Sequence, residues 1–100
     1  MIYQISVPAV ADVEEIRVLE WHGDVGHRFN NGDLIVELET HKAIVEVRAG
    51  QAGVLRKILS EAGKWQRIGL PLALLSDKES ESLPDGTQVV TDLAVDFAIT

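Results

Sequence analysis

The sequence predicts an all-β fold, a sandwich or barrel of short strands, from three observations. Apolar and polar residues alternate in LIVELE (residues 34–39) and AIVEVR (residues 43–48), which is the period of a half-buried strand. Glycine-containing turns punctuate the apolar runs at residues 30–33, 49–51 and around Gly63 and Gly69. No helical period of useful length competes before residue 76. Many short strands with regular turns are typical of this class.

Length and composition bound the domain. One hundred residues with 46% apolar and 25% charged side chains form one globular domain, too short for a typical enzyme with a deep cleft. Cysteine is absent, which excludes a disulfide framework, a thiolate metal site and a cysteine nucleophile. None of the spacings among His22, His27 and His41 fits a helical ligand pair, and no carboxylate cluster accompanies them in the sequence. We therefore expect no metal site and no catalytic residue.

The charge of −7 lies mostly in the last quarter of the chain. Up to Leu75 there are 10 acidic and 8 basic residues, and from Ser76 onward 6 acidic residues and 1 basic one. Without a basic patch interleaved with aromatics, nucleic acid is not an expected partner. The opening MIYQISVPAV has neither a basic leader region nor an unbroken apolar run, so we expect no signal peptide, no membrane contact and a cytoplasmic location.

An internal repeat emerges when the chain is shifted by 37 residues. The shift places Gly26 on Gly63 and Gly32 on Gly69. It also superimposes four apolar pairs: Val18 and Leu55, Trp21 and Ile58, Ile35 and Leu72, Leu38 and Leu75. The identities are few, so this match alone does not establish a duplication.

Two alternating strands flank four residues that suit a β-turn. The alternation assigns Leu34, Val36 and Leu38 to one face and Ile35, Glu37 and Glu39 to the other, with Val45 and Val47 buried on the next strand. Pairing Thr40 with Ala43 then sets Leu38 opposite Val45 and Val36 opposite Val47. A one-residue slip would expose the whole buried set, so the register is strongly specified.

The turn itself has His41 and Lys42 at its centre. Neither is glycine or asparagine, so turns that need positive φ are disfavoured and a type I turn is expected. The Lys42 side chain then projects away from the body, better placed to be modified than to catalyse. Hairpin tips also carry charged residues merely for solubility, and periodicity and spacing do not separate these two interpretations.

The run Gly32-Asp33-Leu34 followed by Glu37-Leu38-Glu39-Thr40-His41-Lys42-Ala43 and Val45-Glu46-Val47 resembles the lipoyl domain of the dihydrolipoyl acyltransferase component of 2-oxo acid dehydrogenase complexes. The likeness extends over residues 2–76, including ISVPAV near the start and AGVLRKILSEAGKWQRIGLPLALL in the second half. It implies a flattened β-barrel, a barrel-sandwich hybrid of two four-stranded antiparallel sheets related by a pseudo-twofold axis. Such a fold would account for the internal repeat.

The resemblance also implies a function, that of a carrier without catalysis of its own. Lipoate would be joined by an amide to Lys42 and would carry acyl groups and reducing equivalents between active sites as a swinging arm. The implied partners are a 2-oxo acid decarboxylase, an acyltransferase core, dihydrolipoyl dehydrogenase, and the lipoate ligase or octanoyltransferase that attaches the cofactor. The isolated domain would be a monomer, and it would be either a free-standing carrier or part of a dihydrolipoyl acyltransferase.

Other residues match family positions that help lipoylating enzymes or partners recognise the domain. Glu39 lies three positions before Lys42 and Gly26 lies sixteen before it, while Thr40, His41 and Ala43 complete the tip. A turn glycine and a solvated strand-end charge are the plainer interpretations of Gly26 and Glu39. The sequence departs from the family at His41, where an aspartate is usual, and at His27 and Lys64, which follow the leading glycine of each half.

Two alternatives share the same fold. Biotinyl domains usually present Met-Lys-Met at the tip, and Thr40-His41-Lys42-Ala43 lacks both methionines. An unmodified barrel acting as a structural or interaction module is the other alternative.

The tail changes character after the predicted domain of residues 1–76. Residues 77–100 begin as an acidic linker, with a turn signal at Pro84-Asp85-Gly86, and continue into LAVDFAI (residues 93–99), whose alternation predicts an extra strand. That strand would pair with the barrel, with another subunit or with a following domain. A helix over residues 88–99 is the lesser alternative.

Overall fold

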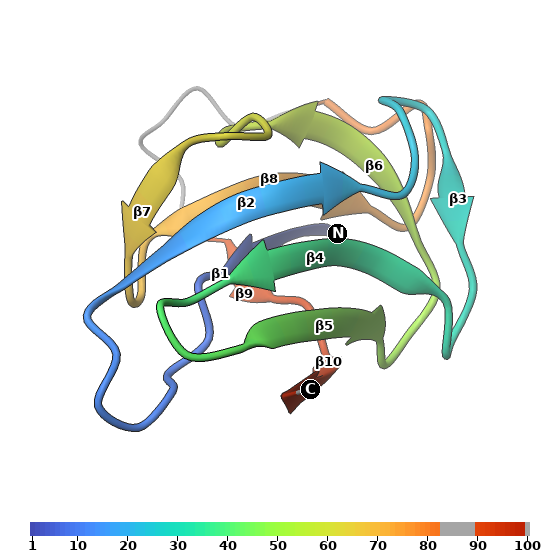
Figure 1. Cartoon of the computed structure of the whole chain (residues 1–100). Helices are drawn as coiled ribbons and strands as arrows, with labels where there is room; N and C mark the ends of the chain where they lie inside the picture. Colours follow the sequence, from blue (N-terminus) through green and yellow to red (C-terminus); the bar gives the residue numbers. More distant parts are fainter. Residues whose placement is uncertain (83–89, 100) are drawn as a thin grey trace.

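Two five-stranded sheets pack face to face in the computed structural model, which describes residues 1–82 and 90–99 (Figure 1). One sheet has the order β3-β6-β8-β1-β9 and the other β10-β5-β4-β2-β7. The strands are β1 (Ile2–Ser6), β2 (Glu15–Trp21), β3 (Arg28–Phe29), β4 (Leu34–Glu39), β5 (Ile44–Ala49), β6 (Gly53–Ile58), β7 (Trp65–Arg67), β8 (Pro71–Ser76), β9 (Thr91–Asp92) and β10 (Val95–Ile99). The predicted all-β class is confirmed, and each sheet gains a fifth strand from the tail.

The 37-residue repeat is a true twofold relation of the backbone. The N–H of Gly26 donates to the carbonyl of Leu55, and the N–H of Gly63 donates to the carbonyl of Val18, both at 2.7 Å. Each half therefore donates to the other at equivalent positions. The sheets follow the same exchange. One sheet combines β2 and β4 of the first half with β7 of the second, and the other combines β6 and β8 of the second half with β3 of the first.

The turns and irregularities of the two halves also correspond. The four glycines that the repeat aligns all have positive φ, with values of 98°, 94°, 91° and 90° for Gly26, Gly32, Gly63 and Gly69. Residues that carry a side chain rarely adopt this backbone conformation, so the glycines mark where each half turns. The pairing register shifts at Val18/Glu20 in β2 and, 37 residues later, at Leu55/Lys57 in β6.

One expectation about strand faces is wrong. Ile35, assigned to the outer face of β4, is fully buried together with its neighbour Val36. The pairing between β4 and β5 shifts between Leu34 and Val36, so Ile35 has no direct partner on β5. Such a bulge bends the strand and lets two consecutive side chains enter the core.

The core lies between the sheets and draws on both halves. Its buried members are Ile5, Val7, Val13, Ile16, Val18, Phe29, Ile35, Val36, Leu38, Val45, Val47, Ala49, Leu55, Leu72, Ala73, Leu75 and Leu93. Most are β-branched residues and leucines, which pack well on a pleated surface. Leu93 belongs to the tail, so residues beyond the repeated unit complete this core.

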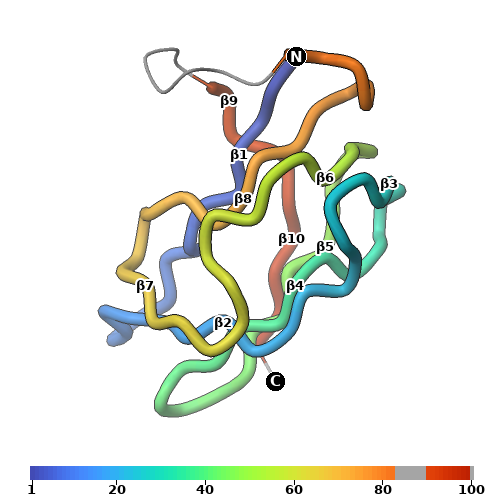
Figure 2. Tube along the Cα trace, turned by 90° about the horizontal axis from the view of Figure 1, so that it is seen from above, coloured from blue at the N-terminus to red at the C-terminus, as the bar shows by residue number. Residues whose placement is uncertain are grey.

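The tail adds one strand to one edge of each sheet. β9 pairs in parallel with β1, and β10 pairs antiparallel with β5, so the chain passes from one sheet to the other (Figure 2). Of the three possible partners for the predicted strand, the barrel itself is the one observed, and the helix alternative is wrong. The turn signal at residues 84–86 lies outside the described residues. The domain boundary at residue 76 stays a prediction.

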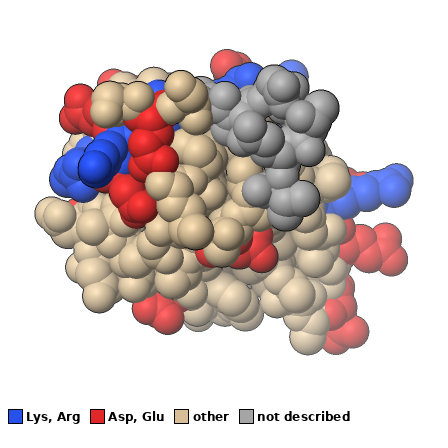
Figure 3. Space-filling view, turned by 180° about the vertical axis from the view of Figure 1, so that it is seen from behind, with Lys and Arg blue, Asp and Glu red and all other residues tan. Residues whose placement is uncertain are grey.

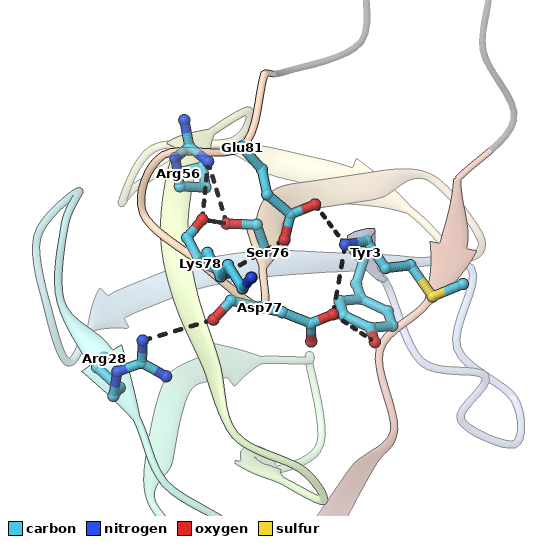
Figure 4. Close-up of polar contacts among 8 residues, drawn as sticks. Tyr3, Arg28, Arg56, Ser76, Asp77, Lys78 and Glu81 are labelled. Carbon is cyan, nitrogen blue, oxygen red and sulfur yellow. Dashed lines mark hydrogen bonds and ion pairs between the residues drawn. The ribbon is translucent and has the colours of Figure 1, made fainter.

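Residues 77–82 pack against the start of the chain through polar contacts (Figure 4). The Met1 amino group forms ion pairs with Glu81 and with Asp77. The hydrogen bond to Glu81 raises the pKa of that amino group, and the same contact lowers the pKa of the Glu81 carboxyl. Arg56 donates to the Ser76 hydroxyl at 3.1 Å. On the face seen in Figure 3, most of the charged side chains, of both signs, lie toward the margins, and acidic atoms also appear near the middle.

The anchoring of the tail can be tested at Leu93, which is 4% exposed and packs in the core. Replacing Leu93 by alanine is expected to lower the free energy of unfolding by about 2–5 kcal/mol, because it leaves a cavity. Ile99→Ala is the matched control, since Ile99 lies on the same tail and is 56% exposed, and its cost should stay below about 1 kcal/mol. Urea denaturation measures both. Equal costs would contradict the burial of the tail in the core.

Candidate functional site

The hairpin of β4 and β5 has the register that the sequence predicts. Leu38 is paired with Val45 and Val36 with Val47, and all four side chains are buried. The prediction is confirmed. Each strand also has a neighbour on its other side, β2 beside β4 and β10 beside β5, so the base of the hairpin is held from both directions.

The side chain of Thr40 closes the turn at the tip. Its Oγ1 accepts hydrogen bonds from the N–H groups of Lys42 (3.0 Å) and Ala43 (2.9 Å) and donates to the carbonyl of Ala43 (3.1 Å). The N–H of Thr40 donates to the same carbonyl at 2.8 Å. A type I turn is usually closed by a backbone carbonyl instead. The threonine hydroxyl thus takes a role that the prediction left to the backbone.

The burial of Thr40 at the end of β4 positions its hydroxyl toward the turn. Thr40 is buried, whereas the two central residues, His41 and Lys42, are exposed and have negative φ as expected. Ala43 is half-buried and leads directly into β5. The tip is a short, hydrogen-bonded turn, and its two central side chains are the exposed ones.

Lys42 has an unengaged amine. Within residues 1–82 and 90–99, no hydrogen bond or ion pair involves its Nζ, and its side chain is exposed. Its nearest sequence neighbour at the tip, His41, is exposed as well. A primary amine in this position is accessible from solvent, and among the described residues no acid or base is paired with it.

Glu39 is not a free charge. Its carboxylate is half-buried and forms an ion pair with Arg17 of β2, with Oε1 of Glu39 2.7 Å from Nη2 of Arg17. The two residues are direct register partners. Any protein that binds Glu39 therefore meets a neutralised pair, and Arg17, which sequence reasoning missed, belongs to this surface. Arg17 could be found only from the pairing of β2 with β4, and the local sequence does not predict that pairing.

Gly26 is not brought to the tip. β2 and β4 run antiparallel with Arg17 opposite Glu39 and Trp21 opposite Val36, so Gly26 follows the end of β2 that is remote from the hairpin turn. Figure 1 shows the β2–β3 turn and the β4–β5 turn at opposite ends of the sheet. The positive φ of Gly26 and the hydrogen bond from its N–H to the carbonyl of Leu55 account for a glycine at this position.

A shallow groove of about 360 Å³ adjoins the tip at His41. Its walls come from the loop before β2 and from β7, and its lining residues are Asp12, Glu14, Glu15, His41 and Trp65. Trp65 is 51% exposed, unusual for so large an aromatic side chain. Sequence reasoning missed this groove, because only the pairing of β7 with β2 brings Trp65 beside Arg17.

The fold and the tip together define a class of protein, a small all-β domain with an exposed lysine at the tip of a hairpin. Comparison with known proteins agrees. The chain matches the Biotin_lipoyl family, described as a biotin-requiring enzyme, over residues 3–75. It belongs to this biotin/lipoyl family, whose domain carries a covalently attached group and is not itself catalytic.

Curated relatives are components of 2-oxo acid dehydrogenase complexes. The chain is 36% identical over 75 residues to a dihydrolipoyllysine-residue succinyltransferase component of the 2-oxoglutarate dehydrogenase complex from Staphylococcus saprophyticus, covering 74% of this chain and 18% of the relative. It is 36% identical over 78 residues to the mitochondrial pyruvate dehydrogenase complex protein X component of Saccharomyces cerevisiae, covering 76% of this chain and 19% of that protein.

A third relative is the pyruvate dehydrogenase E1 component subunit beta of Rhizobium meliloti, 37% identical over 82 residues, which are 79% of this chain and 18% of that protein. The chain thus spans about a fifth of the length of these relatives. The structure also contains no helix, among the described residues, that is long and apolar enough to cross a membrane.

The closing role of Thr40 yields a direct test. Thr40→Val keeps the shape and removes the hydroxyl, which leaves two amides of the turn without their acceptor. The variant should lose about 1–3 kcal/mol of stability, and the amides of Lys42 and Ala43 should exchange with solvent faster. Thr40→Ser, which keeps the hydroxyl, is the control. Hydrogen exchange followed by NMR measures both, and equal protection of the two amides in both variants would disprove the role.

Proposed function

We propose that this chain is a lipoyl carrier domain with lipoate amide-linked to Nζ of Lys42. The observation that carries the proposal is the unengaged, exposed amine of Lys42 at the tip of a hairpin whose turn is closed by Thr40. The name of the Staphylococcus saprophyticus relative contains dihydrolipoyllysine, which supports lipoate as the attached group. The yeast relative is named as a component of a pyruvate dehydrogenase complex.

Attachment requires an amine that an enzyme can reach. Nζ of Lys42 attacks the carboxyl carbon of an activated lipoyl donor, an amide bond forms, the leaving group of the donor departs, and the amine loses a proton. Nothing within the described part of the chain competes for this nitrogen, because no ion pair or hydrogen bond holds it. The exposed tip fits the group.

A rigid root is useful to a carrier. A covalent tether replaces free diffusion by a high effective concentration near each partner, and the fixed hairpin determines where the flexible arm starts. Lipoate, when bound, supplies a dithiolane that accepts electrons and an acyl group. The protein supplies the attachment point of the arm and the surface that partners recognise, and the hairpin keeps the arm away from the core.

The partners follow from the same proposal. A 2-oxo acid decarboxylase would load the arm, an acyltransferase core would unload the acyl group, dihydrolipoyl dehydrogenase would reoxidise it, and a lipoate ligase or octanoyltransferase would attach it. The surface that such enzymes meet includes His41, the Glu39–Arg17 pair and the groove with Trp65. His41 and this groove are the features through which the chain would select among them.

A biotinyl carrier is the second candidate, since the family includes both groups. The tip favours lipoate, because Thr40 and Ala43 stand near the lysine and methionine does not flank it. Thr40 is committed to closing the turn, so this residue is part of the local structure that presents Lys42.

Intact mass decides among lipoate, biotin and no modification. The protein from a host that supplies both cofactors and both ligases should gain the mass of one lipoyl group, and Lys42→Arg should remove the gain. Lys64 is a second exposed lysine, which follows the turn glycine Gly63, and Lys64→Arg should keep the lipoyl mass gain. A biotin-sized gain would support the second candidate. An unmodified wild type beside a fully loaded reference carrier would refute both.

A further inference from the structure

Three potential metal ligands converge on the outer face of the sheet that carries the hairpin. They are Glu20, His22 and Glu37, here called the acid–histidine cluster, and one ligand atom of each lies within 4.8 Å of the other two. His22 Nε2 lies 2.6 Å from Oε1 of Glu37 and 3.7 Å from Oε2 of Glu20. The histidine and Glu37 are half-buried and Glu20 is exposed, so an ion has access from solvent.

The bulge in β2 assembles this cluster. In an unbroken strand Glu20 and His22 would share a face with Val18, which is fully buried. The register shift between Val18 and Glu20 moves Glu20 to the outer face, directly opposite Glu37 of β4. The sequence-based expectation that no carboxylates accompany a histidine is therefore wrong at His22.

The cluster places two carboxylates directly opposite each other on neighbouring strands. Like charges directly opposite on neighbouring strands are destabilising, and Glu20 and Glu37 are such partners. On the same strand Glu39 is neutralised by the guanidinium of Arg17. Within the described residues, the basic group found against Glu20 and Glu37 is the imidazole of His22. A bound cation would therefore reduce the repulsion between the two carboxylates.

The fold does not require these three residues. The twofold-related positions, 37 residues later, are Lys57, Leu59 and Leu74, and the bulge is present there too. Leucine at two of the three positions shows that the backbone arrangement forms without an acid–histidine cluster. The carboxylates and the imidazole are therefore a property of one half of the molecule, independent of its structural repeat.

We propose that the acid–histidine cluster binds one divalent transition-metal ion of the Zn²⁺ type. One imidazole nitrogen and two carboxylate oxygens are ligands that Zn²⁺ accepts at about 2.0–2.2 Å, with water completing the coordination. To bind the ion, Nε2 of His22 and Oε1 of Glu37, which lie 2.6 Å apart, would separate through rotations of their side chains. Nε2 then presents its lone pair to the ion, and the ring proton resides on Nδ1.

Metal titration of the unlipoylated full chain tests this inference, so its result is independent of the carrier function. After treatment with chelator, calorimetry with Zn²⁺ should show one bound equivalent. His22→Gln and Glu37→Gln should each weaken binding at least about tenfold, since each removes one of three protein ligands. His27→Gln is the matched control, because it removes an exposed imidazole that contacts Phe29 and lies outside the cluster.

NMR locates the ion and verifies that the variants are folded. Addition of Zn²⁺ should shift the ring nitrogens of His22 and leave those of His27 unchanged, and the amide spectra of the variants should match the wild type away from the substitution. The inference is overturned if His22→Gln binds Zn²⁺ within threefold of the wild type, or if the shifted imidazole is that of another histidine.

Discussion

The register between β4 and β5 is the constraint on which the rest of the site depends. Four buried side chains in two cross-strand pairs, Leu38 with Val45 and Val36 with Val47, fix it. A slip by one residue would turn this set outward and move the turn along the chain. Because the register is fixed, the four residues between the strands form the tip, and Lys42 takes one of its two exposed central positions.

The exchange of short strands between the two halves stabilises the sheet from which that hairpin extends. Each sheet depends on a short strand of the other half, and the exchanged hydrogen bonds at Gly26 and Gly63 tie the halves together. The tail adds a second constraint, since β10 lies along β5 and Leu93 enters the core. The hairpin thus extends from an interior sheet position, where neighbours on both sides restrain its strands. A rigid base and an exposed tip are the two properties that a carrier of a tethered group requires.

The sequence was informative wherever function depends on periodicity. Alternation predicts the hairpin register, because it follows from the two-residue period of a strand. The spacing of the glycines indicates a repeat, and the family resemblance implies that the repeat is a twofold relation. The burial of Ile35 and the exposure of Glu20 were not predictable in this way. Both depend on bulges, which shift side chains between faces and have no local signature in this chain.

The remaining parts of the site depend on contacts between distant segments. Arg17 reaches Glu39, and Trp65 reaches the groove beside His41, only after β2 has paired with β4 on one side and β7 on the other. The closing role of Thr40 is different, because it is local. It was missed because a side-chain hydroxyl and a backbone carbonyl can close the same four-residue turn, and the residue sequence alone does not choose between them.

The central claim is that Lys42 joins a mobile arm to an immobile tip, and NMR relaxation of the lipoylated domain tests it most directly. Backbone order parameters of residues 39–44 should stay near the value of about 0.85 that is typical of rigid backbone, while the outer part of the arm should fall below about 0.6. If the backbone of the tip is as mobile as the arm, the hairpin does not fix the starting point of the arm, and this account of the site is wrong.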